Sequence, residues 1–287
     1  MSGASEGFQN CQGKRDYHYI KTHITMRTIA AAIWLISCLS ATVFAVQAPD
    51  LNPVADAFLS GNNPNTNYGK AGALGVAGSA AGNTQGVFDS VLKFDLASTV
   101  AFFDSTFLGS PWTISSITLK LKTAPPNNGI FNNPNVAGQF SITWMQNDSW
   151  QEGAGTPAAT ETTGTGITYS NRSSGPATGL STYLSGADEM LGTFLPDVTT
   201  GAITPYSLGL TTSFLADATA GHVISLLILP VDPTVAYLFN SVDNGTMGNR
   251  PVLVVEAVAT PEPSAGTLLA GAALVCLTRR KRHARAA

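Results

Sequence analysis

Residues 117–122 read Ile-Thr-Leu-Lys-Leu-Lys, and this alternation of apolar and polar side chains decides the class of fold. Successive side chains of a β-strand point to opposite faces, so the three apolar residues share one face, which we expect to be buried. The same alternation occurs in further short runs, at residues 54–59, 87–96, 140–144 and 206–210. Two nearly continuous apolar runs, at residues 223–229 and 252–258, are typical of central strands covered on both faces.

The segments between these runs are rich in Gly, Pro and Asn, which form turns and loops. Helical periodicity is weak, and only residues 213–220 are expected to form a short helix. Eight or more strands without alternating helices indicate an all-β fold, a single β-sandwich of jelly-roll type over residues 46–260. Within it, the Gly/Thr/Ser-rich stretch Gly153–Gly186 is long for a loop.

Charge is low and unevenly placed. Only 33 of the 287 residues are charged, or 11%, against about 25% in an ordinary soluble domain. Basic residues concentrate at the two ends, so residues 46–260 hold six basic and fifteen acidic side chains, a formal charge of −9. Such an acidic body argues against nucleic-acid binding, which needs clustered Lys and Arg. Cys11, Cys38 and Cys276 all lie outside it, which excludes disulfides and thiolate metal sites there.

The N-terminal segment has the features of an export signal. Arg27 precedes a long apolar run that ends with small residues at the −3 and −1 positions, Val43 and Ala45. A basic residue, an apolar core and a small-residue cleavage site are the three parts of a secretory signal peptide. We therefore assign residues 26–45 to a signal helix cleaved after Ala45, and residues 1–25 to an upstream extension or a mis-assigned start.

The C-terminal segment has another order: Pro-Glu-Pro at residues 261–263, a mostly apolar stretch at residues 265–277, and a basic cluster at residues 279–282. A helix of this stretch reaches about 20 Å, which is short of the roughly 30 Å hydrocarbon core of a bilayer. The basic cluster favours the cytoplasmic side. The order indicates a stop-transfer tail that holds the protein briefly at the membrane, with a plain transmembrane anchor as the alternative.

This order resembles the PEP-CTERM sorting signal of Gram-negative bacteria that make exopolysaccharide, with Pro261, Glu262 and Pro263 as the sorting motif. The resemblance implies transient anchoring in the inner membrane through a hydrophobic sorting helix. It also implies an exosortase as the processing partner, cleavage near the motif, and delivery to the cell surface or extracellular matrix.

The region between the two signals resembles the DNRLRE domain, also called carbohydrate-binding module family 96, over residues 54–257. The elements that carry the resemblance are, in order, Ala55-Asp-Ala-Phe58, Asn63-Pro-Asn-Thr-Asn-Tyr-Gly69, Leu74-Gly-Val76, Leu92-Lys-Phe-Asp-Leu96, Ile114-Ser-Ser-Ile-Thr-Leu-Lys-Leu121, Asp148-Ser-Trp-Gln-Glu-Gly153, Gly166-Ile-Thr-Tyr169 and Asn249-Arg-Pro-Val-Leu-Val-Val255. The resemblance implies a β-sandwich of jelly-roll type that is associated with polysaccharide binding and with cell surfaces. Tyr169 stands where the family has Trp.

The candidate carbohydrate-binding residues are Trp112, Trp150, Glu152 and Tyr169. An aromatic ring stacks on the apolar C–H face of a sugar, while neighbouring carboxylates and amides bind its hydroxyls. For Trp150 and Glu152 we favour a structural interpretation, in which Trp150 packs in the sandwich and Glu152 accepts turn hydrogen bonds. Ligand binding is the alternative for this pair.

The sequence offers little for catalysis or for a cofactor. His222 is the only histidine in residues 46–260 and directly precedes an apolar run, which favours a strand-end position over the role of a base. Asp148 and Glu152 are the best carboxylate pair for glycoside hydrolysis, but fifteen acids produce such neighbours by chance. No cofactor is expected, and the candidates for a calcium ion, which takes oxygen ligands, are Asp56, Asp95 and Asp243.

These observations predict an exported, non-catalytic protein of the cell surface or extracellular matrix that binds or organises polysaccharide. The first alternative is a purely structural matrix protein without a defined ligand. The second is a polysaccharide lyase or glycoside hydrolase that uses Asp148 or Glu152.

Overall fold

The structure is a computed structural model that describes residues 44–82, 86–125, 131–133, 138–156, 159, 161, 164–172 and 183–260. These residues belong to one compact unit, Phe44–Thr260. Most of the predicted signal peptide and the whole predicted sorting segment lie outside the described residues. Ala45, the predicted cleavage position, is described: it is an exposed residue of the first strand and pairs with Val258.

Strands make up most of the regular structure in the described part. They are β1 (Ala45–Gln47), β2 (Ala55–Ser60), β3 (Ala73–Ala77), β4 (Phe88–Asp95), β5 (Trp112–Lys122), β6 (Phe140–Met145), β7 (Glu189–Phe194), β8 (Ile203–Ser207), β9 (Val223–Pro230), β10 (Ala236–Asn240) and β11 (Val252–Ala259). The short helical elements are α2 (Ala97–Thr106), α3 (Tyr169–Arg172), α4 (Thr212–Thr219) and the 3₁₀ turn η2 (Met247–Asn249).

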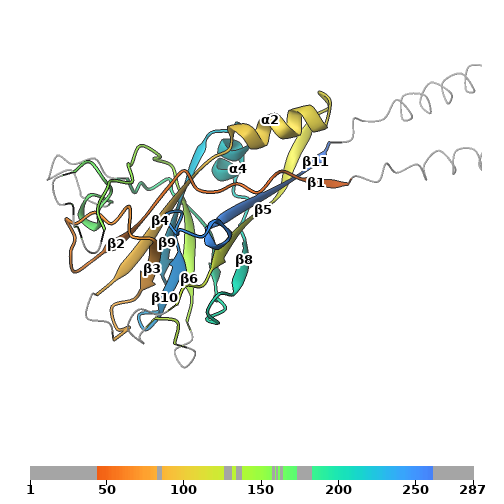
Figure 1. Cartoon of the computed structure of the whole chain (residues 1–287). Helices are drawn as coiled ribbons and strands as arrows, with labels where there is room; N and C mark the ends of the chain where they lie inside the picture. Colours follow the sequence, from red (N-terminus) through yellow and green to blue (C-terminus); the bar gives the residue numbers. More distant parts are fainter. Residues whose placement is uncertain are drawn as a thin grey trace, which may run out of the picture. The chain divides into compact units, whose positions relative to one another are not determined.

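The strands form two antiparallel sheets (Figure 1). The smaller sheet has the order β1-β11-β5-β8. The larger has the order β10-β3-β4-β9-β6-β7, and β2 pairs with β4 outside this path. The prediction of an all-β protein is thereby confirmed at the level of two antiparallel sheets, an arrangement consistent with a β-sandwich.

The two sheets share one hydrophobic core, and strand alternation builds it. In β5, Ile117, Leu119 and Leu121 are buried in this core, as their period of two predicts. Leu92 and Phe94 of β4 enter it from the larger sheet. The two continuous apolar runs become central strands as predicted, since β9 lies between β4 and β6 while β11 lies between β1 and β5.

The opposite face of the larger sheet is covered as well. Val91 of β4 and Leu227 of β9 point away from the inter-sheet core and form a second core with Trp150 and Ile167. Both of the latter residues come from loops. The predicted long loop therefore supplies, in its described part, a cover for the outer face of the sheet.

Of the α-helices in the described part, α4 was predicted, and α2 and the four-residue α3 were not. α4 coincides within one residue with the expected helix at residues 213–220. No sequence pattern indicates α2, because its only fully buried residues are Thr99 and Phe103, and a single pair four residues apart leaves almost no amphipathic pattern. No helix in the described ranges is long and apolar enough to cross a membrane.

Candidate functional site

Three loops meet at the side chain of Asn67, which is only 1% exposed. Its amide nitrogen donates to the carbonyl oxygens of Glu152, at 2.6 Å, and Ile167, at 2.8 Å. Its amide oxygen accepts from the backbone N–H groups of Gly69, at 3.1 Å, and Gly155, at 3.0 Å. One side chain thus satisfies four backbone groups that would otherwise be buried without partners. We call residues 61–70, 150–156 and 164–172 the loop assembly.

Two glycines allow the loops to approach so closely. A Cβ atom on Gly69 would lie 2.1 Å from the carbonyl oxygen of Glu152, and one on Gly153 would lie 2.3 Å from Oδ1 of Asn67. Gly153 also has a φ of +78°, which side chains other than glycine rarely adopt. A further backbone bond, from the N–H of Ser170 to the oxygen of Pro64 at 2.7 Å, closes the assembly.

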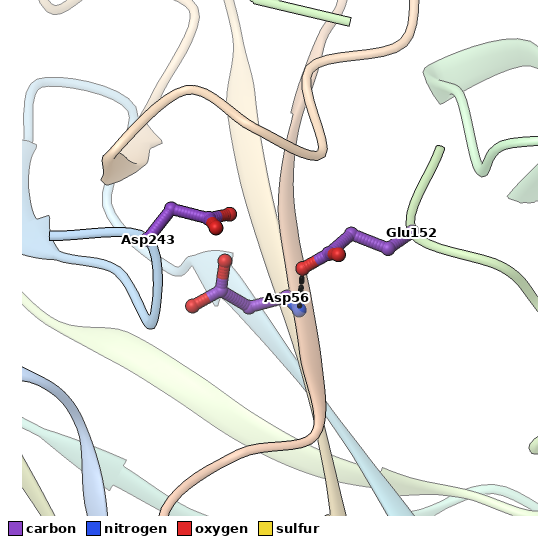
Figure 2. Close-up of side chains that lie close together, drawn as sticks. All are labelled: Asp56, Glu152 and Asp243. Atoms are coloured by element: carbon purple, nitrogen blue, oxygen red, sulfur yellow. Dashed lines mark hydrogen bonds between the residues drawn. The ribbon is translucent and has the colours of Figure 1, made fainter. Parts of the chain in front are cut away.

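Three carboxylates converge beside this assembly, from β2, from a loop and from the turn after β10. Figure 2 shows Asp56, Glu152 and Asp243 pointing toward one another, and their oxygens lie within 4.8 Å of one another. Oε1 of Glu152 accepts the backbone N–H of Asp56 at 2.9 Å, and Oδ2 of Asp56 accepts the N–H of Val242 at 2.6 Å. Residues that lie 187 positions apart in the chain are thereby brought together.

Lys70 supplies the positive charge of this cluster. Its ammonium group binds Glu152 and lies 3.3 Å from Oδ1 of Asp243. Burial, followed by the charges of Glu152 and Asp243, raises the pKa of Asp56 to about 8, although the Val242 hydrogen bond opposes this shift. Asp56 is therefore mostly neutral at pH 7, which leaves two carboxylates facing one ammonium group.

The calcium candidates are partly brought together. Asp56 and Asp243 belong to the cluster, whereas Asp95 is exposed at the start of α2, where Oδ1 accepts the N–H of Ala97 at 3.0 Å. Carboxylate oxygens are suitable calcium ligands, but calcium takes about six to eight oxygens. Three carboxylates with Lys70 already bound among them fit a cluster whose negative charge the lysine partly offsets better than they fit a calcium site.

Trp150 is a packing residue in this structure. It is 1% exposed, and its indole N–H donates to Oγ of Ser225 at 2.8 Å. The ammonium group of Lys93 lies 4.3 Å from the ring centroid and donates to the carbonyl oxygen of Asp148 at 2.8 Å. The Trp150 ring is thus enclosed by the protein and offers no free face to a sugar. Burial lowers the pKa of Lys93.

Tyr169 lies half-buried in α3, beside a buried ion pair. The guanidinium of Arg172 stacks 4.0 Å from the centre of the Tyr169 ring. The same group lies 2.7 Å from Oδ2 of Asp89, with exposed fractions of 13% for Arg172 and 1% for Asp89. Burial raises the pKa of Asp89 to about 6, although the Arg172 charge opposes this shift. The ion pair fastens α3 to the outer face of β4.

Trp112 lies elsewhere. It is half-buried at the start of β5, packs against the inter-sheet core, and donates its indole N–H to Oδ1 of Asp104 at 2.9 Å. Tyr169 packs instead against the second core, on the other face of the larger sheet. The four predicted binding residues therefore do not form one surface: Trp150, Glu152 and Tyr169 belong to the loop assembly, but the Trp150 ring is buried, and Trp112 is separate.

Asp148 and Glu152 have different neighbours, although only four residues separate them. Glu152 binds Lys70 and the backbone N–H of Asp56. Burial, and after it the charge of Asp217, raises the pKa of Asp148 to about 6, although a hydrogen bond with Ser225 opposes this shift. His222 is 66% exposed before β9 and pairs with Asp217 at 2.8 Å, which agrees with a strand-end position. Glycosidase carboxylates face one bond from either side, and these two side chains belong to separate clusters.

The sequence matches no protein-family model, and no curated protein matches it significantly. The resemblances to the DNRLRE domain and to the PEP-CTERM signal therefore stay predictions that rest on the residues quoted above.

Several residues that organise the site were not predicted from the sequence: Asn67, Lys70, Asp89, Lys93 and Arg172. Asn67 lies in a run of Asn, Pro and Thr, which is typical of a turn, and nothing in that pattern indicates that one amide holds three loops. Asp89 and Lys93 had one feature that could have indicated a role. Both are charged residues on the outer face of β4, a strand whose residues are nearly all buried.

Proposed function

We propose that this chain is an exported, non-catalytic protein of a Gram-negative cell surface or extracellular matrix, and that it binds or organises polysaccharide through the loop assembly. In this proposal it is a DNRLRE-like jelly-roll sandwich that is exported by its signal peptide and processed by an exosortase at Pro261–Pro263. One observation carries the proposal. The segments around Asn67, Glu152 and Ile167, which hold separate elements of the family resemblance, converge on a single buried amide.

The surface of the assembly has groups that suit a sugar. Lys70 is 44% exposed, Glu152 is 14% exposed, and the two are paired, so they present one donor and one acceptor at fixed positions. Tyr169 adds a half-buried aromatic ring, which Arg172 holds in place. Hydrogen-bonding groups and an aromatic ring on one loop assembly are the groups that recognise the hydroxyls and the apolar face of a pyranose.

Charge favours a neutral polysaccharide over an acidic one. Residues 46–260 have a formal charge of −9, so a polyanion is repelled at long range at low salt. We expect that affinity gels containing neutral glycans retard the protein, and that gels containing uronate or sulfate polymers retard it less.

Matched variants locate the binding surface. Tyr169→Ala and Lys70→Ala are expected to reduce retardation at least severalfold, while Trp112→Phe, at a site away from the assembly, leaves it unchanged. A thermal melt of each variant separates lost binding from lost folding. Equal retardation of wild type and both assembly variants, or no retardation on any glycan, would overturn the proposal.

A purely structural matrix protein is the second candidate, and the burial of aromatic residues favours it. Trp144 and Trp150 are 4% and 1% exposed and serve internal packing. This candidate predicts that Trp150→Ala lowers thermal stability strongly, and that no surface variant changes retention in the extracellular polymer. Hydrolysis or lyase chemistry by Asp148 or Glu152 is less well supported, because their carboxylates have separate neighbours. An activity screen that detects product release from any polysaccharide would restore it.

A further inference from the structure

An aromatic cluster lies at the corner where α2 leads into β5. Phe103 is fully buried, and three half-buried rings surround it: Phe102, Phe107 and Trp112, with centroid distances of 5.6, 6.2 and 5.1 Å. Leu108 stands next to this cluster and is 89% exposed. We call Phe102, Phe107, Leu108 and Trp112 the aromatic corner.

Leu108 is held in an unfavourable conformation. Its φ of +51° lies in the left-handed region, which residues other than glycine rarely adopt. The conformation places one of the most exposed large apolar side chains of the described part at the tip of a turn. Strain that displays an apolar group to solvent indicates a surface whose partner lies outside the domain.

The chain leaves the domain at this corner. The N–H of Thr260, the last described residue, donates to the carbonyl oxygen of Pro111 at 2.7 Å, and Ala259 pairs with Trp112. The apolar C-terminal stretch begins at Ala265, only five residues further along the sequence. Five residues span at most about 18 Å when fully extended. Once that stretch is in a bilayer, Thr260 and the Pro111 to which it bonds lie within about this distance of the lipid surface.

We propose that the aromatic corner rests on the bilayer surface while the C-terminal segment is still attached. This inference rests on the anchoring step of the proposed function. Trp and Phe rings favour the interface between headgroups and acyl chains. Within residues 97–113 the only charged side chain is Asp104, which is paired with Trp112, so the corner suits zwitterionic lipid. Phe44 is also exposed, but it precedes the predicted cleavage site and is not part of the proposed surface.

Quenching of Trp112 fluorescence by brominated lipids tests the contact. The full chain carrying Trp34→Phe, which leaves Trp112 and the two buried tryptophans, is bound to phosphatidylcholine vesicles with brominated acyl chains. We expect bromine to quench a component of the emission, and adding Trp112→Phe to abolish that component. Leu108→Gly is expected to reduce quenching severalfold without unfolding, because glycine relieves the positive φ.

The control is Met247→Gly, which removes another apolar side chain that is 73% exposed. Met247 lies in η2, shortly before β11 begins, whereas the aromatic corner lies beside the residue at which β11 ends. It is expected to leave quenching unchanged. Co-sedimentation with the vesicles reports anchoring, and gel retardation reports polysaccharide binding, so failures of the proposed function are seen separately. The inference is wrong if the chain does not sediment with vesicles, if quenching survives Trp112→Phe, or if Leu108→Gly has no effect. It is equally wrong if the lipid-free protein dimerises through the corner and Leu108→Gly makes it monomeric.

Discussion

The two faces of the larger sheet are both buried, but by different means. The inner face packs apolar side chains such as Leu92 and Phe94 against the smaller sheet. The outer face is covered by loops that Asn67, Lys93 and Arg172 hold in place through polar contacts. Apolar packing tolerates changes of side chain when volume is kept, whereas a buried polar contact fails when one partner is lost.

This difference predicts two kinds of response to mutation. Loss of an inner-face residue is expected to weaken the whole domain, because both sheets share that core. Loss of an outer-face polar residue is expected to release the loop assembly while leaving the two sheets intact. Variants on each face test this separation.

Asn67→Ala is expected to have the largest effect. It removes hydrogen bonds to four backbone groups, and each group left buried without a partner costs about 1–3 kcal/mol. We expect the free energy of unfolding of the loop assembly to fall by about 4 kcal/mol. Native-state hydrogen exchange should show faster exchange at Gly69, Gly155 and Ile167, and unchanged slow exchange in β9.

Leu92→Ala is the matched inner-face variant. A cavity of this kind costs about 2–5 kcal/mol and should raise exchange rates in both sheets together. If Asn67→Ala also accelerates exchange throughout β9, the two faces are one cooperative unit and the proposed separation is wrong.

Arg172→Met is expected to cost about 3 kcal/mol, because it leaves the carboxylate of Asp89 buried without its partner. Adding Asp89→Asn should restore most of the loss, since a neutral amide is easier to bury than a lone charge. Arg250→Met, which removes one contact to the oxygen of Asn244, is the control and should cost less than about 1 kcal/mol. Chemical denaturation of the four proteins measures these differences.

The inner face was readable from the sequence, and most of the outer face was not. A period of two places Ile117, Leu119 and Leu121 in the core, because strand geometry alone decides their side. Nothing local decides that Asn67 accepts from Gly155 or that Asp56 meets Asp243. Those contacts depend on where distant loops return to the sheet, and a single sequence has no local signal for that.

The calcium candidates illustrate the same limit. Asp56 and Asp243 were predicted as calcium candidates and do lie together. Asp95 does not join them, whereas Lys70 does. Residue type indicated oxygen ligands, whereas the counter-charge came from a lysine that no motif distinguished. Glu152 was expected to accept hydrogen bonds within a turn, whereas it accepts the backbone N–H of Asp56, a residue of the distant strand β2.

Asp56→Asn is expected to change how stability depends on pH. The pKa of Asp56 is about 8 in the folded protein and near 3.8 in the unfolded chain, so the folded state holds the proton more tightly. The free energy of unfolding of wild type therefore falls as pH rises from about 4 to about 8. The variant lacks this loss, so its stability relative to wild type should improve by up to about 1.4 kcal/mol for each pH unit across that range.

Denaturation curves at several pH values measure this difference. Asp89 and Asp148, whose pKa values are also raised by burial, titrate in both proteins and cancel in the comparison. Asp104→Asn, which replaces an exposed aspartate of α2, is measured alongside as the control. A constant difference between pH 4 and pH 8 would mean that Asp56 is ionised in the folded cluster.

The smallest expected effect concerns the hydrogen bond between Trp150 and Ser225. Ser225→Ala leaves the indole N–H buried without an acceptor and should cost about 1–2 kcal/mol. Trp150→Phe removes that N–H but keeps an aromatic ring in the second core, so Ser225→Ala should cost less in the Trp150→Phe background than in wild type. A double-mutant cycle measures the coupling, which we expect to be about 1 kcal/mol. A coupling near zero would mean that Trp150 is held by apolar packing and by Lys93 alone, and the outer face would then resemble the inner face more closely than the polar contacts indicate.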